Sequence, residues 1–290
     1  LVTKGMRDLF ALQRHDRRAI YDLHYRKPVP IVERRHVLEI DERLSAGGGV
    51  VKALDPIAAK AALAQFLSEH EFDAVAICLL HSYANPAHER ALADIVRECA
   101  PGMSVTCSCD VSREFREYER ASTTALAGYV QPVIEGYINR LVATLERHSF
   151  SGRFSIMQSN GGRMPSHAMA KNAIAALFSG PAAGVVGAIG VAGRSGYNDI
   201  ITLDMGGTST DVSLVSGGEP ELAAQTEIDG LPVRTPVIDI VTVGAGGGSI
   251  AWVDDGGLLR VGPQSAGATP GPASYGRGGD LPTVTDAHLI

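Results

Sequence analysis

Residues 204–211 read Asp-Met-Gly-Gly-Thr-Ser-Thr-Asp and gather two carboxylates, two adjacent glycines and three hydroxyl side chains in one short run. Adjacent glycines let backbone N–H groups approach an anion because no Cβ is in the way. The hydroxyls add further donors, and Asp204 is placed to hold a hydrated divalent cation beside phosphates. The run therefore predicts a phosphate-binding turn. The alternative is a hairpin turn whose glycines serve geometry alone and whose Asp and Thr side chains cap the backbone.

Two strands are expected to hold this turn, because residues 200–203 and 212–215 flank it with alternating polarity. A second glycine run, 244–249, follows the strand-like residues 238–243. Proteins of the α/β class place phosphates where a strand enters such a loop. The spacing is not that of a dinucleotide fingerprint, and residues 250–253 resemble a further strand. A ligand-binding loop and a tight structural turn are both open at this point.

The first third of the chain alternates predicted helices and strands. The pair Asp55-Pro56 has the residue types of an N-cap and a first helical position, which predicts a helix to about residue 68. The apolar run 74–80 predicts a strand covered on both faces. Asn85-Pro86 repeats the cap signature before a second helix, and residues 105–107 predict the next strand. This order implies a right-handed parallel crossover.

The middle of the chain begins with a dense charge run at residues 113–120. A solvated helix face is the simplest interpretation of such a run. Ser122 or Thr123 then has the residue type of an N-cap for an amphipathic helix. Pro132 should kink or restart that helix.

The composition, with 45% hydrophobic and 20% charged residues among 290, is that of an ordinary globular protein. The net charge of −6 argues against nucleic acid or an anionic membrane as the main partner. Four cysteines in neither a disulfide nor a zinc spacing favour reduced thiols in a cytoplasmic protein. Residues 173–193 are uncharged, but their many glycines and alanines favour a buried, close-packed helix from near Ser179 over a membrane span. The first and last residues lead us to expect a segment of a longer protein.

Several motifs resemble the hydantoinase A / 5-oxoprolinase family. The most specific are DMGGTSTDV at 204–212, VGAGGGSIAWVD at 243–254 and GGLLRVGPQSAGATPGPASYGRGG at 256–279. Supporting matches are REYERASTT at 116–124, QSNGG at 158–162 and SGPAAGVVGA at 179–188. The resemblance covers nearly the whole chain.

The resemblance implies an α/β, ribonuclease-H-like architecture of the actin-like ATPase type, in which two halves clasp ATP and Mg²⁺. Residues 1–112 would be the C-terminal part of the family's N-terminal domain, and residues 113–290 a hydantoinase A domain truncated at its C-terminus. Family members use ATP to activate a cyclic amide, such as a hydantoin or 5-oxoproline, for hydrolysis. A hydantoinase B-like subunit or domain usually completes the reaction, so an oligomer is expected.

In line with this resemblance, we predict roles for single residues. Asp204 would hold the water shell of the metal, and Asp211 would orient hydroxyls or a water. Arg120 would be a charge-stabilising side chain in the cleft between the halves. The expected donors to phosphate oxygens are Gly206, Gly207, Thr208, Ser209 and Thr210.

Two further groups complete the predicted site. Asn160, Gly161 and Gly162 would form a polar lining of the cleft. The glycine loop would line the nucleotide or the substrate, which the sequence leaves open, through Gly246, Gly247, Gly248 and Ser249. For Asp286, a helix N-cap is the expected role.

The chain also departs from the family pattern. The family has an Asp-x-Gly-Gly-Thr-x-Thr-Asp loop near its N-terminus that forms a first phosphate clamp, and this chain has no such loop there. It also lacks a later Gly-Gly-Ala-Gly-Pro-like loop near the adenosine, so it would carry only the second clamp, at residues 204–211. We therefore expect the isolated chain to hydrolyse ATP poorly or not at all. Two alternatives to cyclic amide hydrolysis are a subunit of an ATP-dependent ketone carboxylase and a nucleotide-binding assembly module without turnover.

Overall fold

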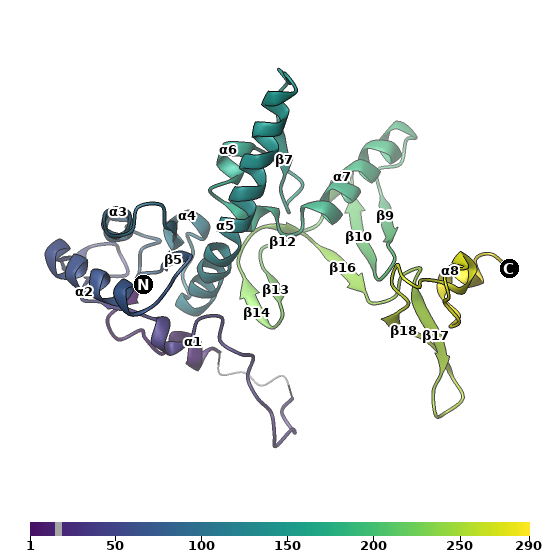
Figure 1. Cartoon of the computed structure of the whole chain (residues 1–290), viewed down its shortest axis with the longest axis horizontal. Coiled ribbons are helices and arrows are strands. Elements are labelled where there is room, and N and C mark those ends of the chain that lie inside the picture. The colour runs from purple at the N-terminus through teal and green to yellow at the C-terminus, as the bar shows by residue number, and fades with distance from the viewer. Residues whose placement is uncertain (15–18) are drawn as a thin grey trace. The chain divides into compact units, whose positions relative to one another are not determined.

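The computed structural model describes residues 1–14 and 19–290, which form two compact units (Figure 1). Unit 1 comprises residues 1–158, 163–177 and 224–236, and unit 2 comprises residues 159–162, 178–223 and 237–290. Each unit is a set of segments that pack mainly on one another, so its bounds need not be those of a family domain. The predicted division at residue 112 concerns family domains and stays a prediction.

Unit 1 is built on the predicted strand–helix–strand crossover. The strands β5 (Ala74–Ile77) and β6 (Ser104–Cys107) pair in parallel, and α3 (Ala87–Cys99) connects them. The helix α2 (Pro56–Glu69) begins as predicted, because Asp55 accepts hydrogen bonds from the N–H groups of Ile57 and Ala58. Leu63, Ile77 and Leu92 are fully buried between these elements and form the centre of the core.

Short elements complete unit 1. They are α1 (Leu9–Leu12), η1 (Arg34–His36), α4 (Ser108–Val111), α6 (Ser166–Met169), η2 (Ala173–Ala176), β1 (Val2–Thr3), β2 (Glu39–Ile40), β3 (Arg43–Leu44), β4 (Val50–Lys52), β7 (Ser155–Met157), β8 (Arg163–Pro165), β13 (Thr226–Ile228) and β14 (Leu231–Val233). The pair β1–β2 is parallel, and an isolated parallel bridge joins Val2 to Cys78 directly after β5. The other pairs are antiparallel hairpins: β3–β4, β7–β8 and β13–β14.

The helix α5 (Glu117–Arg147) differs from the prediction. It begins before Ser122 and Thr123 and continues through Pro132. The residues predicted as N-caps are buried inside it, and the Thr123 hydroxyl donates to the Glu119 carbonyl one turn earlier. The charged start of α5 is also not a solvated face, since Glu119 and Arg120 are buried. Tertiary burial of the first half of the helix overrides the local cap signal.

Unit 2 is an antiparallel sheet with one helix packed on it. The hairpin of β9 (Ile200–Met205) and β10 (Thr210–Ser216) forms as predicted, and β16 (Ile240–Val243) pairs with the other side of β10. The remaining elements are β11 (Glu219–Pro220), β12 (Leu222–Ala223), β15 (Val237–Ile238), β17 (Ser249–Val253), β18 (Leu259–Ser265), η3 (Ala273–Tyr275) and α8 (Val284–Ala287).

The helix α7 (Ser179–Arg194) begins where the sequence predicts it but is not buried all round. Only Ala182 and Val185 of this helix are buried. They pack against Val215 of β10 and Ile238 of β15 (Val237–Ile238). Among the described residues, no helix has both the length and the apolar character needed to cross a membrane.

The four cysteines are free thiols, as predicted. Cys107 ends β6, whereas Cys109 lies in α4, so the two do not share one strand. Burial raises the pKa of the Cys78 thiol to about 12. A thiol that stays protonated at neutral pH is a poor nucleophile, so Cys78 is a packing residue.

Leu63 and Ile57 provide a matched test of the unit 1 core, because both lie on α2. Leu63 is fully buried, whereas Ile57 is 83% exposed. We expect Leu63→Ala to lower the free energy of unfolding by about 2–5 kcal/mol, because it leaves a cavity. Ile57→Ala should change it by less than about 0.5 kcal/mol. Urea unfolding followed by far-UV circular dichroism measures both; equal effects would contradict the described packing.

Candidate functional site

Asp204 and Asp211 face each other across the β9–β10 hairpin. They are directly opposed in the register, and Thr242 of β16 is the next residue across the sheet from Asp211. The Thr242 hydroxyl donates to Asp211 Oδ1 at 2.7 Å. Two like charges at opposed positions repel each other. A divalent cation between or beside them would remove that repulsion.

The two carboxylates line a pocket of about 400 Å³ within unit 2. Its other side is formed by α7, where Gly184 faces Asp204 Oδ2. A Cβ at Gly184 would already be 3.5 Å from that oxygen, so glycine leaves the carboxylate room for a ligand. Carboxylate oxygens are the ligands that Mg²⁺ prefers, and the residues present therefore fit such an ion.

The turn after β9 keeps three backbone donors available. Gly206 N donates to Ser209 O at 2.9 Å and closes the turn. Within the described part of the chain, the N–H groups of Gly207, Thr208 and Ser209 have no hydrogen-bond acceptor. Successive free N–H groups in a turn form a concave site for an anion. The turn is thus suited to a phosphate group.

Thr210 differs from its predicted role as a phosphate donor. It is buried, and its hydroxyl donates to the carbonyl of Ala245 at 2.5 Å. Its side chain therefore ties the hairpin to the second glycine run.

The glycine loop also differs from the predicted ligand-lining role, because protein acceptors occupy its amides. Gly247 N donates to Gly206 O at 2.9 Å, and Gly248 N to Gly207 O at 2.7 Å. Gly246 N donates to the Ser249 hydroxyl at 2.8 Å, and Ser249 N to Gly246 O at 3.0 Å. The loop thus packs on the turn, and these four amides are not available to a ligand in this conformation.

The segment 159–162 belongs to unit 2 and is bonded within it. Asn160 Oδ1 accepts from Gly162 N at 2.9 Å, so the side chain closes its own turn. Gly161 has φ of +82° and packs so closely on Val186 and Ile238 that a Cβ would be 3.0 and 3.2 Å from their side chains. These contacts give the segment a structural role, and its predicted role in lining a cleft stays a prediction.

Arg120 lies in unit 1 and has no exposed surface. Its guanidinium donates to the carbonyl of Leu79 at 2.5 Å and to the side chains of Ser82, Ser108 and Glu117. A fully buried guanidinium that is bonded to these partners can reach a substrate only after the structure rearranges. The described structure therefore does not support the catalytic role predicted for Arg120.

Asp286 is not the N-cap that the sequence predicts. Thr283 caps α8, and Asp286 completes a capping box from the third helical position. Hydrogen bonds, first from Ser274 and then from Thr283, hold the pKa of the Asp286 carboxyl well below its usual range.

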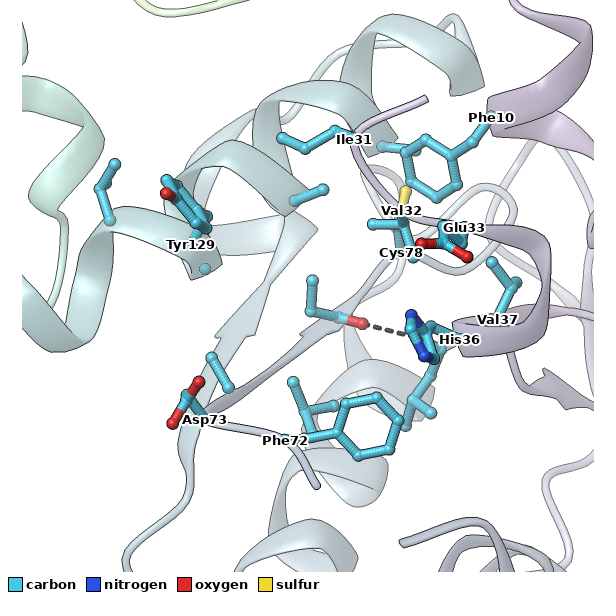
Figure 2. Close-up of a pocket in the computed structure, with 18 of the residues that line it drawn as sticks. Phe10, Ile31, Val32, Glu33, His36, Val37, Phe72, Asp73, Cys78 and Tyr129 are labelled. Carbon is cyan, nitrogen blue, oxygen red and sulfur yellow. Dashed lines mark hydrogen bonds between the residues drawn. The ribbon is translucent and has the colours of Figure 1, made fainter. Parts of the chain in front are cut away.

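Unit 1 contains a larger pocket, of about 1020 Å³, that the sequence did not indicate (Figure 2). Its walls are mostly aliphatic and aromatic, and Phe10, Val32 and Phe72 are among them. Its polar side chains include Glu33, His36, Glu71, Asp73 and Tyr129. None of the predicted site residues lines it, so size alone does not make it the chemical site.

A buried cluster of Glu89, Cys107 and Cys109 also lies in unit 1. The Glu89 carboxylate already accepts from the N–H groups of Leu79 and Cys109 and from serine hydroxyls. A hydrogen bond with Cys107 and burial both raise the pKa of the Cys109 thiol. Metal binding requires a thiolate and free oxygens, so we assign no metal to this cluster.

Thr242 is the site residue that sequence reasoning missed. Strand alternation predicts which residues of 238–243 share a face, but not how this strand aligns with β10. The register that places Thr242 beside Asp211 is visible only in the folded sheet.

Two family models match this chain. The family model described as hydantoinase/oxoprolinase matches residues 120–290, and the model of the hydantoinase/oxoprolinase N-terminal region matches residues 1–100. The chain belongs to the hydantoinase/oxoprolinase family.

Similar proteins include the caprolactamase subunit alpha of Pseudomonas jessenii, which is 40% identical over 93% of this chain and 38% of its own length. The 5-oxoprolinase of Saccharomyces cerevisiae is 36% identical over 100% of this chain and 24% of its own length. This member of the hydantoinase/oxoprolinase family thus spans less than half the length of these relatives.

Solved structures show the same fold. The crystal structure of the ATP-dependent caprolactamase from Pseudomonas jessenii superimposes with a TM-score of 0.84 and 38% identity, over 99% of this chain and 42% of that one. The nucleotide-free acetone carboxylase gives a TM-score of 0.76 and 30% identity, over the same 99% and 42%. They confirm the predicted α/β fold class of the actin-like ATPase type.

The opposed carboxylates make a prediction for Mg²⁺ binding. Millimolar MgCl₂ should raise the melting temperature of the chain by a few degrees, because the cation removes the repulsion between Asp204 and Asp211 and binds only the folded state. Asp204→Asn and Asp211→Asn should each lose most of this response. Differential scanning fluorimetry measures the shift, with NaCl of equal ionic strength as the control for screening. A shift of the same size in both variants would place the ion elsewhere.

Proposed function

We propose that the turn at 206–209 binds the phosphates of ATP in an enzyme that hydrolyses a cyclic amide of the hydantoin or 5-oxoproline type. One observation carries the proposal: three free backbone N–H groups lie in a turn between two opposed carboxylates. Membership of the hydantoinase/oxoprolinase family supports the reaction class. Two similar proteins are an ATP-dependent caprolactamase and a 5-oxoprolinase, which supports ATP as the cofactor and a cyclic amide as the substrate.

Each part of the site has a task in this proposal. The N–H groups of Gly207, Thr208 and Ser209 donate to phosphate oxygens and neutralise charge that develops during transfer. Asp204 and Asp211 would hold Mg²⁺, and the Thr242 hydroxyl fixes the Asp211 carboxylate. The bound metal would supply Lewis-acid polarisation of the phosphates. Transfer of the γ-phosphoryl group from ATP to the amide oxygen, with ADP as the leaving group, would make the ring carbon electrophilic. Water would then add to that carbon, the C–N bond would break as the nitrogen takes a proton, and a second water would release phosphate from the acyl phosphate.

The complete reaction requires more than this chain in our proposal. The relatives are longer, and one is named as a subunit, which supports an assembly with a hydantoinase B-like partner. The isolated chain should hydrolyse ATP poorly or not at all, and a cytoplasmic location stays a prediction.

A ketone carboxylase subunit is the second candidate function. The similarity to the acetone carboxylase structure supports this second function, since that match covers 99% of the chain, as the caprolactamase match does. A nucleotide-binding module without turnover is the third.

Phosphate release by the full-length protein separates these three functions. Release that is stimulated by a hydantoin, 5-oxoproline or a lactam supports the cyclic amide hydrolase. Release that requires a ketone and bicarbonate supports the carboxylase. Nucleotide binding without release under either condition supports the module and contradicts the proposed reaction.

Asp204 should be required for turnover. We expect Asp204→Asn in the full-length protein to preserve folding and to lower turnover on the order of a hundredfold, because it removes an electrostatic anchor of the metal. Asp255→Asn is the matched control, since Asp255 is an exposed carboxylate of the same unit that does not line the pocket. Steady-state phosphate release measures both variants, and unaltered kinetics in Asp204→Asn would remove this residue from the mechanism.

A further inference from the structure

The glycine loop touches the turn at 206–209 more closely than any side chain would allow. A Cβ at Gly246 would be 2.7 Å from each of three backbone atoms, Gly206 O, Thr208 N and Ser209 N. Backbone atoms of a tight turn cannot move aside as the end of a flexible side chain can. Position 246 therefore accepts only glycine as long as the turn keeps its conformation.

The orientation of the turn's donors follows from the hydrogen bonds of the loop. The carbonyls of Gly206 and Gly207 point at the loop, because they accept from Gly247 N and Gly248 N. In a planar trans peptide the carbonyl and the following N–H point in opposite directions. The two bonds thus turn the N–H groups of Gly207 and Thr208 away from Gly247 and Gly248, the residues that donate them.

The loop is in turn fixed from its other side. The backbone N–H and the hydroxyl of Thr285 both donate to Gly247 O at 2.8 Å. Ala266 N donates to Gly248 O at 2.8 Å, and Ser249, the last residue of the loop, is fully buried. All these residues belong to unit 2.

We propose that residues 245–249, fixed by Thr285, are a positioning loop that aims the backbone donors of the turn at the phosphates and does not itself bind nucleotide or substrate. The inference rests on the proposed function, because the turn must be the phosphate site for its orientation to matter. It assigns Gly246, Ser249 and Thr285 a positioning role. The sequence left open whether this loop lines the nucleotide or the substrate. Under this proposal it lines neither of them.

Gly246→Ala and Gly244→Ala form the matched test in the full-length protein. A Cβ at Gly244 would have no atom of the described chain within 4 Å, and the two changes are chemically identical. Gly246→Ala should raise the KM for ATP at least tenfold, since the turn must shift to admit the methyl group. Gly244→Ala should stay within twofold of the unchanged protein. Phosphate release at varied ATP concentration gives KM and kcat separately.

Thr285 provides a second variant in case Gly246→Ala fails to fold. Thr285→Val keeps the shape of the side chain but removes the hydroxyl bond to Gly247 O, and it should raise the KM for ATP severalfold. Thr285→Ser restores the hydroxyl and should restore KM. Melting temperatures of all variants show whether a change in KM follows a general loss of stability.

The outcomes separate this inference from the proposed function. If Gly246→Ala and Thr285→Val match Gly244→Ala in KM while Asp204→Asn loses turnover, the loop has no positioning role and the proposed site stands. If Asp204→Asn is also unaffected, the site itself is wrong. The inference is supported if Gly246→Ala and Thr285→Val both raise the KM for ATP and Thr285→Ser restores it.

Discussion

Backbone hydrogen bonds between two glycine runs hold the candidate site together. Gly247 and Gly248 donate to the carbonyls of Gly206 and Gly207. Glycine at 246 and 248 allows the two segments to approach, because a Cβ at these positions would be 2.7 and 2.9 Å from backbone atoms of the turn. A hydrogen bond between neutral backbone groups contributes about 1 kcal/mol to stability, so these bonds matter less for their energy than for the direction they impose. The orientation of two of the turn's amides follows from this contact, whereas the register of β9 and β10 places the opposed carboxylates.

Much of the hairpin and of the first crossover could be predicted from the sequence, because each depends on local signals. The alternation in 200–203 and 212–215 specifies the two strands, and the glycines between them specify the turn. Asp55 caps its helix as predicted, since the cap bonds reach only two and three residues ahead. The family resemblance supplied the fold class, which local periodicity could not.

The parts that could not be predicted depend on contacts between distant residues. Ser122 and Thr123 have the types of helix caps, yet packing in unit 1 buries them inside α5. Arg120 lies in a charge run typical of a solvent-exposed face, but its partners Ser82 and Ser108 come from other elements. The glycine loop was open to two interpretations because its acceptors lie about forty residues away along the chain, which spacing within the loop cannot reveal.

The use of main-chain donors has a consequence for how this site responds to substitution. Replacing Thr208 or Ser209 by alanine removes a hydroxyl but leaves the amide in place, so alanine scanning would underestimate the contribution of these positions. Proline is the one standard residue that deletes an amide hydrogen. In the function that we propose, the sensitivity of this turn to substitution lies in its backbone amides, which a proline scan or an amide-to-ester replacement would measure.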